Sequence, residues 1–201
     1  MNSLAFILLS FVVSIFALPN GQDNRMRLLF PAKLIDKPIK MYAEPRLGFS
    51  WGLCDSTVKY PAMLQSLTIS PSPLHLPGAV TVSASGTVAA DIKAPIKVAL
   101  VIHKKVLGQW FKIPCVDNLG SCTYDDICTK LPPPTQACPP ILQKYGIPCH
   151  CPVPKGSYNL PSSTMNVNVP VEIPSGDYEI NIQASANGVL QSCVNAQFSI
   201  A

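Results

Sequence analysis

Eight cysteines constrain what this chain can fold into more than any other feature of its sequence. Six of them fall between residues 115 and 151, in a stretch dense in proline, and the other two stand far from it on either side. An even number of cysteines in a secreted chain predicts four disulfides, although spacing alone leaves on the order of a hundred pairings open. The eight are Cys54, Cys115, Cys122, Cys128, Cys138, Cys149, Cys151 and Cys193.

A metal site is the rival interpretation of the same cysteines. Cys149-His150-Cys151 places three soft ligands side by side. Zinc-binding cysteines usually have two to four residues between them, so a single intervening residue is unusual. We therefore expect disulfides, no bound metal and no cofactor.

The first residues of the chain determine the compartment that we expect. Residues 4–18 are apolar apart from Ser10 and Ser14, and this stretch is too short to span a membrane comfortably. Ala17 is a small residue where signal peptidase can cut. We therefore predict a cleaved signal peptide over residues 1–18, with an uncleaved anchor as the alternative. The protein then enters the secretory pathway and reaches the lysosome or the extracellular space.

Charge is distributed unevenly behind this segment. Residues 19–48 carry six Lys and Arg against three acidic residues and show no sustained periodicity, which predicts a flexible basic tail or linker. Residues 49–201 carry nine against eight and form the predicted folded domain. Because a nucleic-acid-binding protein normally has a concentrated basic face, we expect no nucleic-acid partner.

Hydrophobic alternation with a period of two predicts a domain of half-buried antiparallel strands. Apolar and polar side chains alternate over residues 165–173 and again over 178–184. Pro174-Ser175-Gly176 between them predicts a turn, so the two segments are expected to form a β-hairpin. Further strands are expected at 66–70, 80–83, 96–102 and 196–200.

The cysteine-rich segment 115–151 is predicted to be a loop region rather than sheet. The chain contains 21 prolines, which argue against long helices because each removes a backbone donor and clashes with the preceding turn. A short helix can begin at Asp125-Asp126 or at Pro139-Pro140. The predicted fold class is therefore all-β, a single antiparallel domain with a disulfide-stapled loop and short-helix segment.

The sequence holds no recognisable catalytic motif. His75, His103 and His150 lack a G-x-S-x-G or H-E-x-x-H context. Oxidised cysteines provide no thiol nucleophile, and the adjacent carboxylates Asp125 and Asp126 are better explained by a turn or a helix N-terminus. We therefore predict that the protein is not an enzyme.

Val106 to Phe111 stands out among the apolar segments, because Trp110 and Phe111 follow Gly108 near a predicted turn. Ordinary core packing is one interpretation of the two aromatic residues. The other is an aromatic lip at a cavity mouth or a membrane surface, where tryptophan is favoured because one edge of its ring is polar.

A set of segments along the domain carries a family resemblance. Phe49-Ser50-Trp51 leads to Cys54-Asp55, and the likeness is densest between residues 94 and 128, where Trp110-Phe111-Lys112-Ile113-Pro114-Cys115 occurs. Further matching segments are 65–69, 76–78, 120–123, 145–152 and 176–178. Together they cover residues 49–200 with all eight cysteines in order, and they resemble the ganglioside-activator family of lysosomal sphingolipid activators.

The resemblance implies a β-cup or sandwich-like domain, in which antiparallel sheet curls around a large apolar cavity. It implies a lipid-binding and lipid-transfer protein that extracts a glycosphingolipid or other two-chain lipid from a membrane, contacts that membrane transiently and presents the lipid to a β-hexosaminidase. The implied disulfides are Cys54–Cys193, Cys115–Cys122, Cys128–Cys151 and Cys138–Cys149. The residues expected to line the cavity or its mouth are Leu67, Ile69, Val80, Val82, Ile96, Val98, Leu100, Val106, Leu107, Trp110, Phe111, Val167, Val169, Val171, Ile180 and Ile182.

An alternative function of a different class uses the same cysteines. A secreted, disulfide-rich interaction module or inhibitor would present the 115–151 loops as its surface and carry no lipid. A compact interior without a cavity would favour this alternative.

Overall fold

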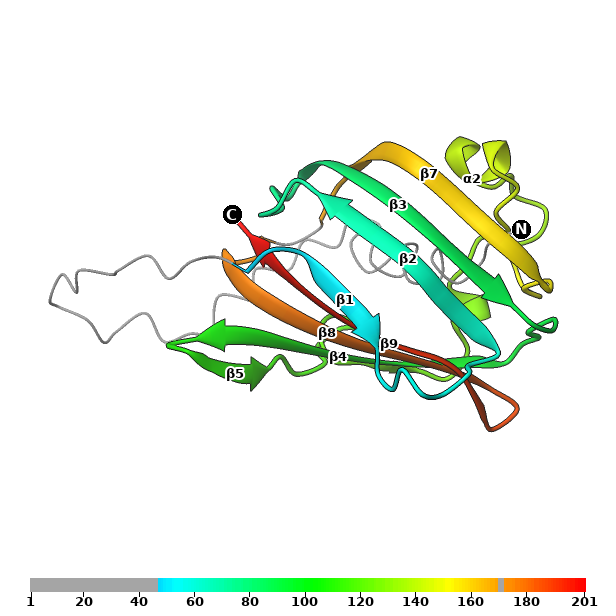
Figure 1. Ribbon diagram of the computed structural model, residues 1–201, viewed down its shortest axis with the longest axis horizontal. Coiled ribbons are helices and arrows are strands. Elements are labelled where there is room, and N and C mark those ends of the chain that lie inside the picture. Colours follow the sequence, from blue (N-terminus) through cyan, green and yellow to red (C-terminus); the bar gives the residue numbers. More distant parts are fainter. Residues whose placement is uncertain (1–46, 170–171) are drawn as a thin grey trace, which may run out of the picture.

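Two antiparallel β-sheets that face each other form the computed structural model, which describes residues 47–169 and 172–201 (Figure 1). The predicted signal peptide, nearly all of the predicted tail, and Val171 lie outside the described residues. The large sheet contains β1 (Ser50–Leu53), β4 (Ile96–Val106), β5 (Gln109–Lys112), β6 (Thr123–Tyr124), β8 (Gly176–Ala186) and β9 (Val189–Ile200). The small sheet contains β2 (Ala62–Ser70), β3 (Gly78–Val88) and β7 (Gly156–Val167).

The order of the strands confirms an all-β, antiparallel fold. The large sheet runs β1-β9-β8-β4-β5, with β6 paired to β4, and the small sheet runs β2-β3-β7. The strands predicted at 66–70, 80–83, 96–102 and 196–200 lie within β2, β3, β4 and β9. Each strand is longer than predicted, because sheet pairing continues past the residues with the clearest alternation.

The predicted hairpin between residues 165–173 and 178–184 is wrong. β7 pairs with β3 in the small sheet, whereas β8 pairs with β4 and β9 in the large sheet. The chain therefore crosses from one sheet to the other between Val167 and Gly176. Apolar alternation is the same in both arrangements, because it reports which face of a strand is buried and does not report which strand lies beside it.

The cysteine-rich segment contains two short helices at the two predicted starting points. The 3₁₀ helix η2 (Ile127–Thr129) begins after Asp126, whose carboxylate accepts hydrogen bonds from the Cys128 and Ile96 backbone N–H groups at 3.0 and 3.1 Å. Asp126 therefore caps the helix and ties it to β4, which confirms the structural interpretation of this carboxylate. The second helix, α2 (Pro140–Lys144), begins with a proline and buries Leu142.

Four disulfides join the cysteines in the pairing that the family resemblance implied. Cys54–Cys193 connects the end of β1 to β9 and closes a sequence separation of 139 residues. The other three bonds lie within the cysteine-rich segment and span 7, 23 and 11 residues: Cys115–Cys122, Cys128–Cys151 and Cys138–Cys149.

A five-residue pattern, Pro-x-Gly-x-Tyr, begins both β7 and β8. In each copy the tyrosine hydroxyl donates a hydrogen bond to the carbonyl oxygen of the proline four residues earlier, Tyr158 to Pro154 and Tyr178 to Pro174. Gly176 has a φ of 140°, which a residue with a side chain rarely adopts. The pattern therefore fixes how the chain enters one strand of each sheet.

Replacing Tyr178 by phenylalanine is expected to lower the free energy of unfolding by about 1 kcal/mol, because the Pro174 carbonyl loses its donor. Burial raises the pKa of Tyr178 from 10.0 to about 12. The stabilisation that comes from the neutral phenol is therefore complete below pH 10 and is lost as the pH rises towards 12. Urea unfolding near neutral pH and again at alkaline pH tests both statements. The phenylalanine variant should lose less stability than the wild type over this range, and an equal loss would contradict the assignment.

Candidate functional site

The apolar faces of the two sheets point towards each other and share one cluster of buried side chains. Most of the residues predicted to line a cavity belong to it: Leu67, Val80, Val82, Ile96, Val98, Leu100, Val167, Ile180 and Ile182. Ile69 and Val169 are partly buried and pack against the same cluster. The interior between the sheets is therefore the candidate site, and contact of these side chains with lipid stays a prediction.

Sequence reasoning missed several large apolar side chains of this interior, among them Leu64 in β2 and Tyr158 and Leu160 in β7, which are buried. A β-bulge inserts an extra residue in each of these strands, after Leu64 in β2 and after Leu160 in β7. Each bulge shifts the alternation by one residue, so a strict period of two fails across it. Before each bulge, buried and more exposed residues still alternate, at Ala62 and Leu64 in β2 and at Tyr158 and Leu160 in β7. This short alternation is the signal that could have identified Leu64, Tyr158 and Leu160.

The hairpin between β4 and β5 presents the predicted aromatic lip to solvent. Its two-residue turn places Leu107 and Gly108 at φ values of 50° and 79°, and the Leu107 side chain is 98% exposed. Turns of this kind favour asparagine and glycine, and leucine pays a conformational cost at the first position. Val106, Trp110 and Phe111 are exposed around it. An exposed leucine in an unfavourable conformation is explained neither by packing nor by turn preference, and it marks a candidate contact surface.

Trp110 and Phe111 lie on opposite faces of the large sheet, so the predicted lip has two sides. Phe111 is paired with Lys104, and Lys104 is paired with the buried Tyr178, which places all three on the inner face. Trp110 is paired with Lys105 on the outer face. Phe111 therefore belongs to the rim of the interior, while Trp110 belongs to the outer surface of the hairpin.

A lysine stands among aromatic rings on this inner face. The Lys104 ammonium lies 5.6 Å from the centre of the Tyr178 ring, and Tyr178 stacks on Phe198 with ring centres 5.9 Å apart. Partial burial lowers the pKa of Lys104. No aspartate or glutamate of residues 47–169 and 172–201 forms an ion pair with it. Among the residues that the structure describes, the Tyr178 ring is therefore what offsets this charge, together with residual solvent.

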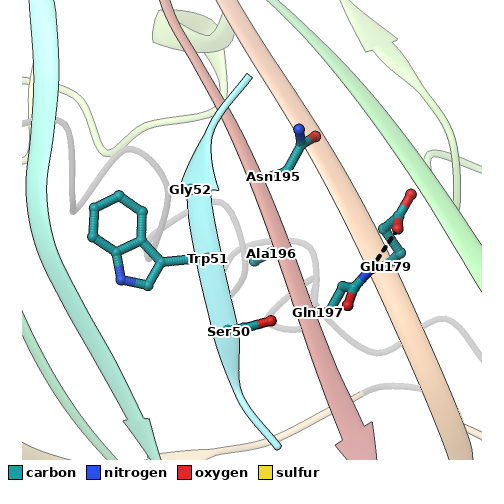
Figure 2. Close-up of a pocket in the computed structure, with 7 residues that line it drawn as sticks. All are labelled: Ser50, Trp51, Gly52, Glu179, Asn195, Ala196 and Gln197. Atoms are coloured by element: carbon teal, nitrogen blue, oxygen red, sulfur yellow. Dashed lines mark hydrogen bonds between the residues drawn. The ribbon is translucent and has the colours of Figure 1, made fainter. Parts of the chain in front are cut away.

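A polar row crosses the outer face of the large sheet and includes a hollow of about 250 Å³ (Figure 2). The Gln197 amide donates to Glu179 Oε2 at 2.8 Å, and His103 Nδ1 lies 3.9 Å from Glu179 Oε1 without a hydrogen bond. The Trp51 indole extends to the side of β1 away from Glu179 and Gln197 in Figure 2. The hollow therefore belongs to the solvent-facing side of the sheet and not to the apolar interior.

The two cysteine sulfur atoms nearest to the His150 ring belong to one disulfide bond. His150 Nε2 lies 3.5 Å from Cys138 Sγ and 3.4 Å from Cys149 Sγ, while His150 Nδ1 is 2.8 Å from the Pro132 carbonyl oxygen. The two sulfur atoms are bonded to each other, so neither is a thiolate that could bind zinc.

The chain is similar in sequence to known proteins over most of its length. The family model described as the ML domain matches residues 48–200. The ganglioside GM2 activator of Mus musculus is 43% identical over 178 residues, which cover 85% of this chain and 89% of that protein. The activator of Macaca fascicularis is 39% identical over 179 residues, covering 86% and 91%. A Niemann-Pick type C2 protein from the Japanese carpenter ant aligns in structure with a TM-score of 0.41 and 17% identity, covering 76% of this chain and 99% of that one.

Within residues 47–169 and 172–201, no helix has the length and apolar character needed to span a bilayer.

The match over residues 48–200 and the identity to the two activators determine the family. This chain belongs to the ML-domain family, and within it to the ganglioside GM2 activators.

Proposed function

We propose that this protein binds a two-chain glycosphingolipid between its sheets, transfers it out of membranes and presents its sugar to a β-N-acetylhexosaminidase, with no catalysis of its own. The observation that carries the proposal is the pair of facing apolar sheet surfaces in a chain 43% identical to a ganglioside GM2 activator.

The energetics of lipid extraction explain why opposed apolar surfaces are needed. A lipid with two long chains has on the order of thirty CH₂ groups, and each costs about 0.8 kcal/mol to expose to water. Extraction is feasible only if protein surface replaces the hydrocarbon of the bilayer almost completely. Strands with one continuous apolar face provide such a surface, and the Cys54–Cys193 disulfide holds β1 against β9 within the large sheet.

The β4–β5 hairpin is the proposed point of contact with the membrane. Leu107 is available to insert into the bilayer, and Val106 and Trp110 lie beside it. Lys105 and Lys112 lie on the outer face of the same hairpin, each paired with a residue of the neighbouring strand. Apolar side chains at the tip and lysines behind it match the layers of a membrane surface, with acyl chains below and anionic headgroups above.

The proposed compartment is the secretory pathway, with the lysosome or the extracellular space as destination. Four disulfides support it, because such bonds form and persist in oxidising compartments. The body of the domain is close to electrically neutral, which fits transient and reversible contact with a membrane.

Protein purified under native conditions is expected to carry or accept glycolipid at about one molecule per chain. Mass spectrometry of organic extracts measures the stoichiometry, and movement of labelled glycolipid between vesicles measures transfer. Protein that contains no lipid and moves none between vesicles would contradict the proposal. A β-N-acetylhexosaminidase added to the same vesicles tests presentation, since the protein should accelerate hydrolysis of embedded glycolipid and leave hydrolysis of a water-soluble substrate unchanged.

A further inference from the structure

Lys104 forms no ion pair with an acidic residue of the described part of the chain, and it lies on the inner face of the large sheet, near the exposed hairpin. Lys104 is in the same cross-strand row as Phe111 on one side and Tyr178 on the other, and Tyr178 is paired in turn with Phe198. The row thus consists of three aromatic rings and one ammonium group. The neighbouring rows on this face contain Ile102 and Ile180, and then Leu100 and Ile182.

The chain leaves room for this lysine. A methyl group on Gly176 would approach Lys104 Cε to 3.2 Å, which is tighter than ordinary van der Waals contact. The glycine of the Pro-x-Gly-x-Tyr pattern therefore does two things: it permits the backbone conformation that begins β8, and it leaves space for the lysine stem across the pair of strands.

The energetics of this arrangement point to an external anion. A partly buried ammonium loses hydration, and the Tyr178 ring offsets only part of that loss. Partial burial lowers the pKa of Lys104, because the loss of hydration disfavours its charged form. An oxyanion that arrived with a ligand would supply the missing partner.

We propose that Lys104 is a specificity-determining residue that pairs with an anionic group on the head of the bound lipid, a sialate, sulfate or phosphate. The inference rests on the proposed lipid-transfer function. Acyl chains would lie among the apolar rows deeper in the interior, and the headgroup would lie beside the aromatic row near the hairpin. Lys104 then favours acidic lipids over neutral lipids with the same chains.

The test compares two lipids that differ by one anion, galactosylceramide and its sulfated derivative, each diluted in phosphatidylcholine vesicles. The wild type is expected to transfer the sulfated lipid in preference to the neutral one. Lys104→Met keeps the apolar stem and removes the charge, and it should reduce that preference about tenfold, as expected for one charge-assisted hydrogen bond. Lys104→Arg should retain the preference.

Lys97→Met is the matched control, because it removes the same charge from the same strand β4, on the opposite face of the sheet and at the end away from the hairpin. It should leave the preference unchanged. Equal loss in the two methionine variants would assign the effect to attraction between protein and vesicle and would overturn the proposal, as would a Lys104→Met variant with unaltered preference. If Lys104→Met does not fold, as judged by its thermal transition, Lys104→Gln replaces it with the same expected result.

Two further outcomes separate this inference from the function on which it rests. Wild-type protein that transfers neither lipid refutes the lipid-transfer function itself, whereas wild-type protein that transfers both without preference refutes only the role of Lys104. Inorganic sulfate added to the assay distinguishes the source of the anion. A site for a lipid headgroup should retain its preference at millimolar sulfate, and loss of the preference there would indicate a site for free anions instead.

Discussion

Replacing Leu107 by glutamate is expected to slow lipid transfer from vesicles by about tenfold or more while leaving the stability of the fold unchanged. Burying one leucine side chain in an apolar environment is worth about 1.5–3 kcal/mol, and inserting a carboxylate carries an additional cost. The side chain is 98% exposed, so its replacement removes no packing within the protein. Transfer of fluorescent lipid between vesicles measures the rate, and thermal unfolding measures stability.

The opposite end of the large sheet offers a matched control. The turn between β8 and β9 exposes Val189, which is 55% accessible, and this turn lies beside the start of β4 whereas Leu107 lies at its end. Val189→Glu should therefore leave the transfer rate unchanged. If it slows transfer as much as Leu107→Glu does, the hairpin is not the contact surface. Trp110→Ala should also slow lipid uptake from vesicles, but by a smaller factor than Leu107→Glu.

A further variant at the same position separates the turn conformation from the membrane contact. Asparagine is favoured at the left-handed conformation that Leu107 adopts, so Leu107→Asn should raise the thermal midpoint. It should also slow transfer, because the apolar side chain is lost. A leucine that lowers stability but increases the rate is the pattern expected where function and turn preference conflict.

The buried faces of most strands could be predicted from the sequence, but the partners of those strands could not. Alternation correctly identified Val167 and Ile180 as inward-facing, and both lie in the shared cluster. The turn-like sequence Pro174-Ser175-Gly176 predicts a hairpin between their two strands. In the structure the two strands belong to different sheets. Partner choice depends on contacts between distant segments, such as β7 with β3, which local pattern does not encode.

The rim of the site shows the same limit at the scale of single residues. Gly108 and its neighbours correctly indicated an exposed turn, and Trp110 and Phe111 were grouped as one lip. Cross-strand pairing separates them, because adjacent residues of a strand point to opposite faces. The disulfide pairing, by contrast, came from the family resemblance, since eight cysteines alone left the alternatives open.

Removing the Cys54–Cys193 disulfide by replacing both residues with serine is expected to lower the free energy of unfolding by about 5 kcal/mol. This is a larger loss than we expect from removing any of the other three disulfides. The bond closes a sequence separation of 139 residues, and in the chain-entropy model the loss of unfolded-state entropy grows with the logarithm of that separation. It also joins β1, an edge strand of the large sheet, to β9, so its loss should release the start of the domain. Urea unfolding measures the change, with lipid present and absent.

The serine pair Cys115→Ser and Cys122→Ser is the control, because that bond closes only 7 residues and the same model assigns it about 2.5 kcal/mol. Lipid should restore part of the stability lost with Cys54–Cys193, because a ligand bound only to the folded state stabilises it by mass action. Equal destabilisation in the two double variants would show that local contacts, and not loop closure, determine what each bond contributes. If the free energy of unfolding falls strongly and added lipid does not restore any of it, the bond stabilises the pairing of β1 with β9 independently of the interior in which lipid is proposed to bind.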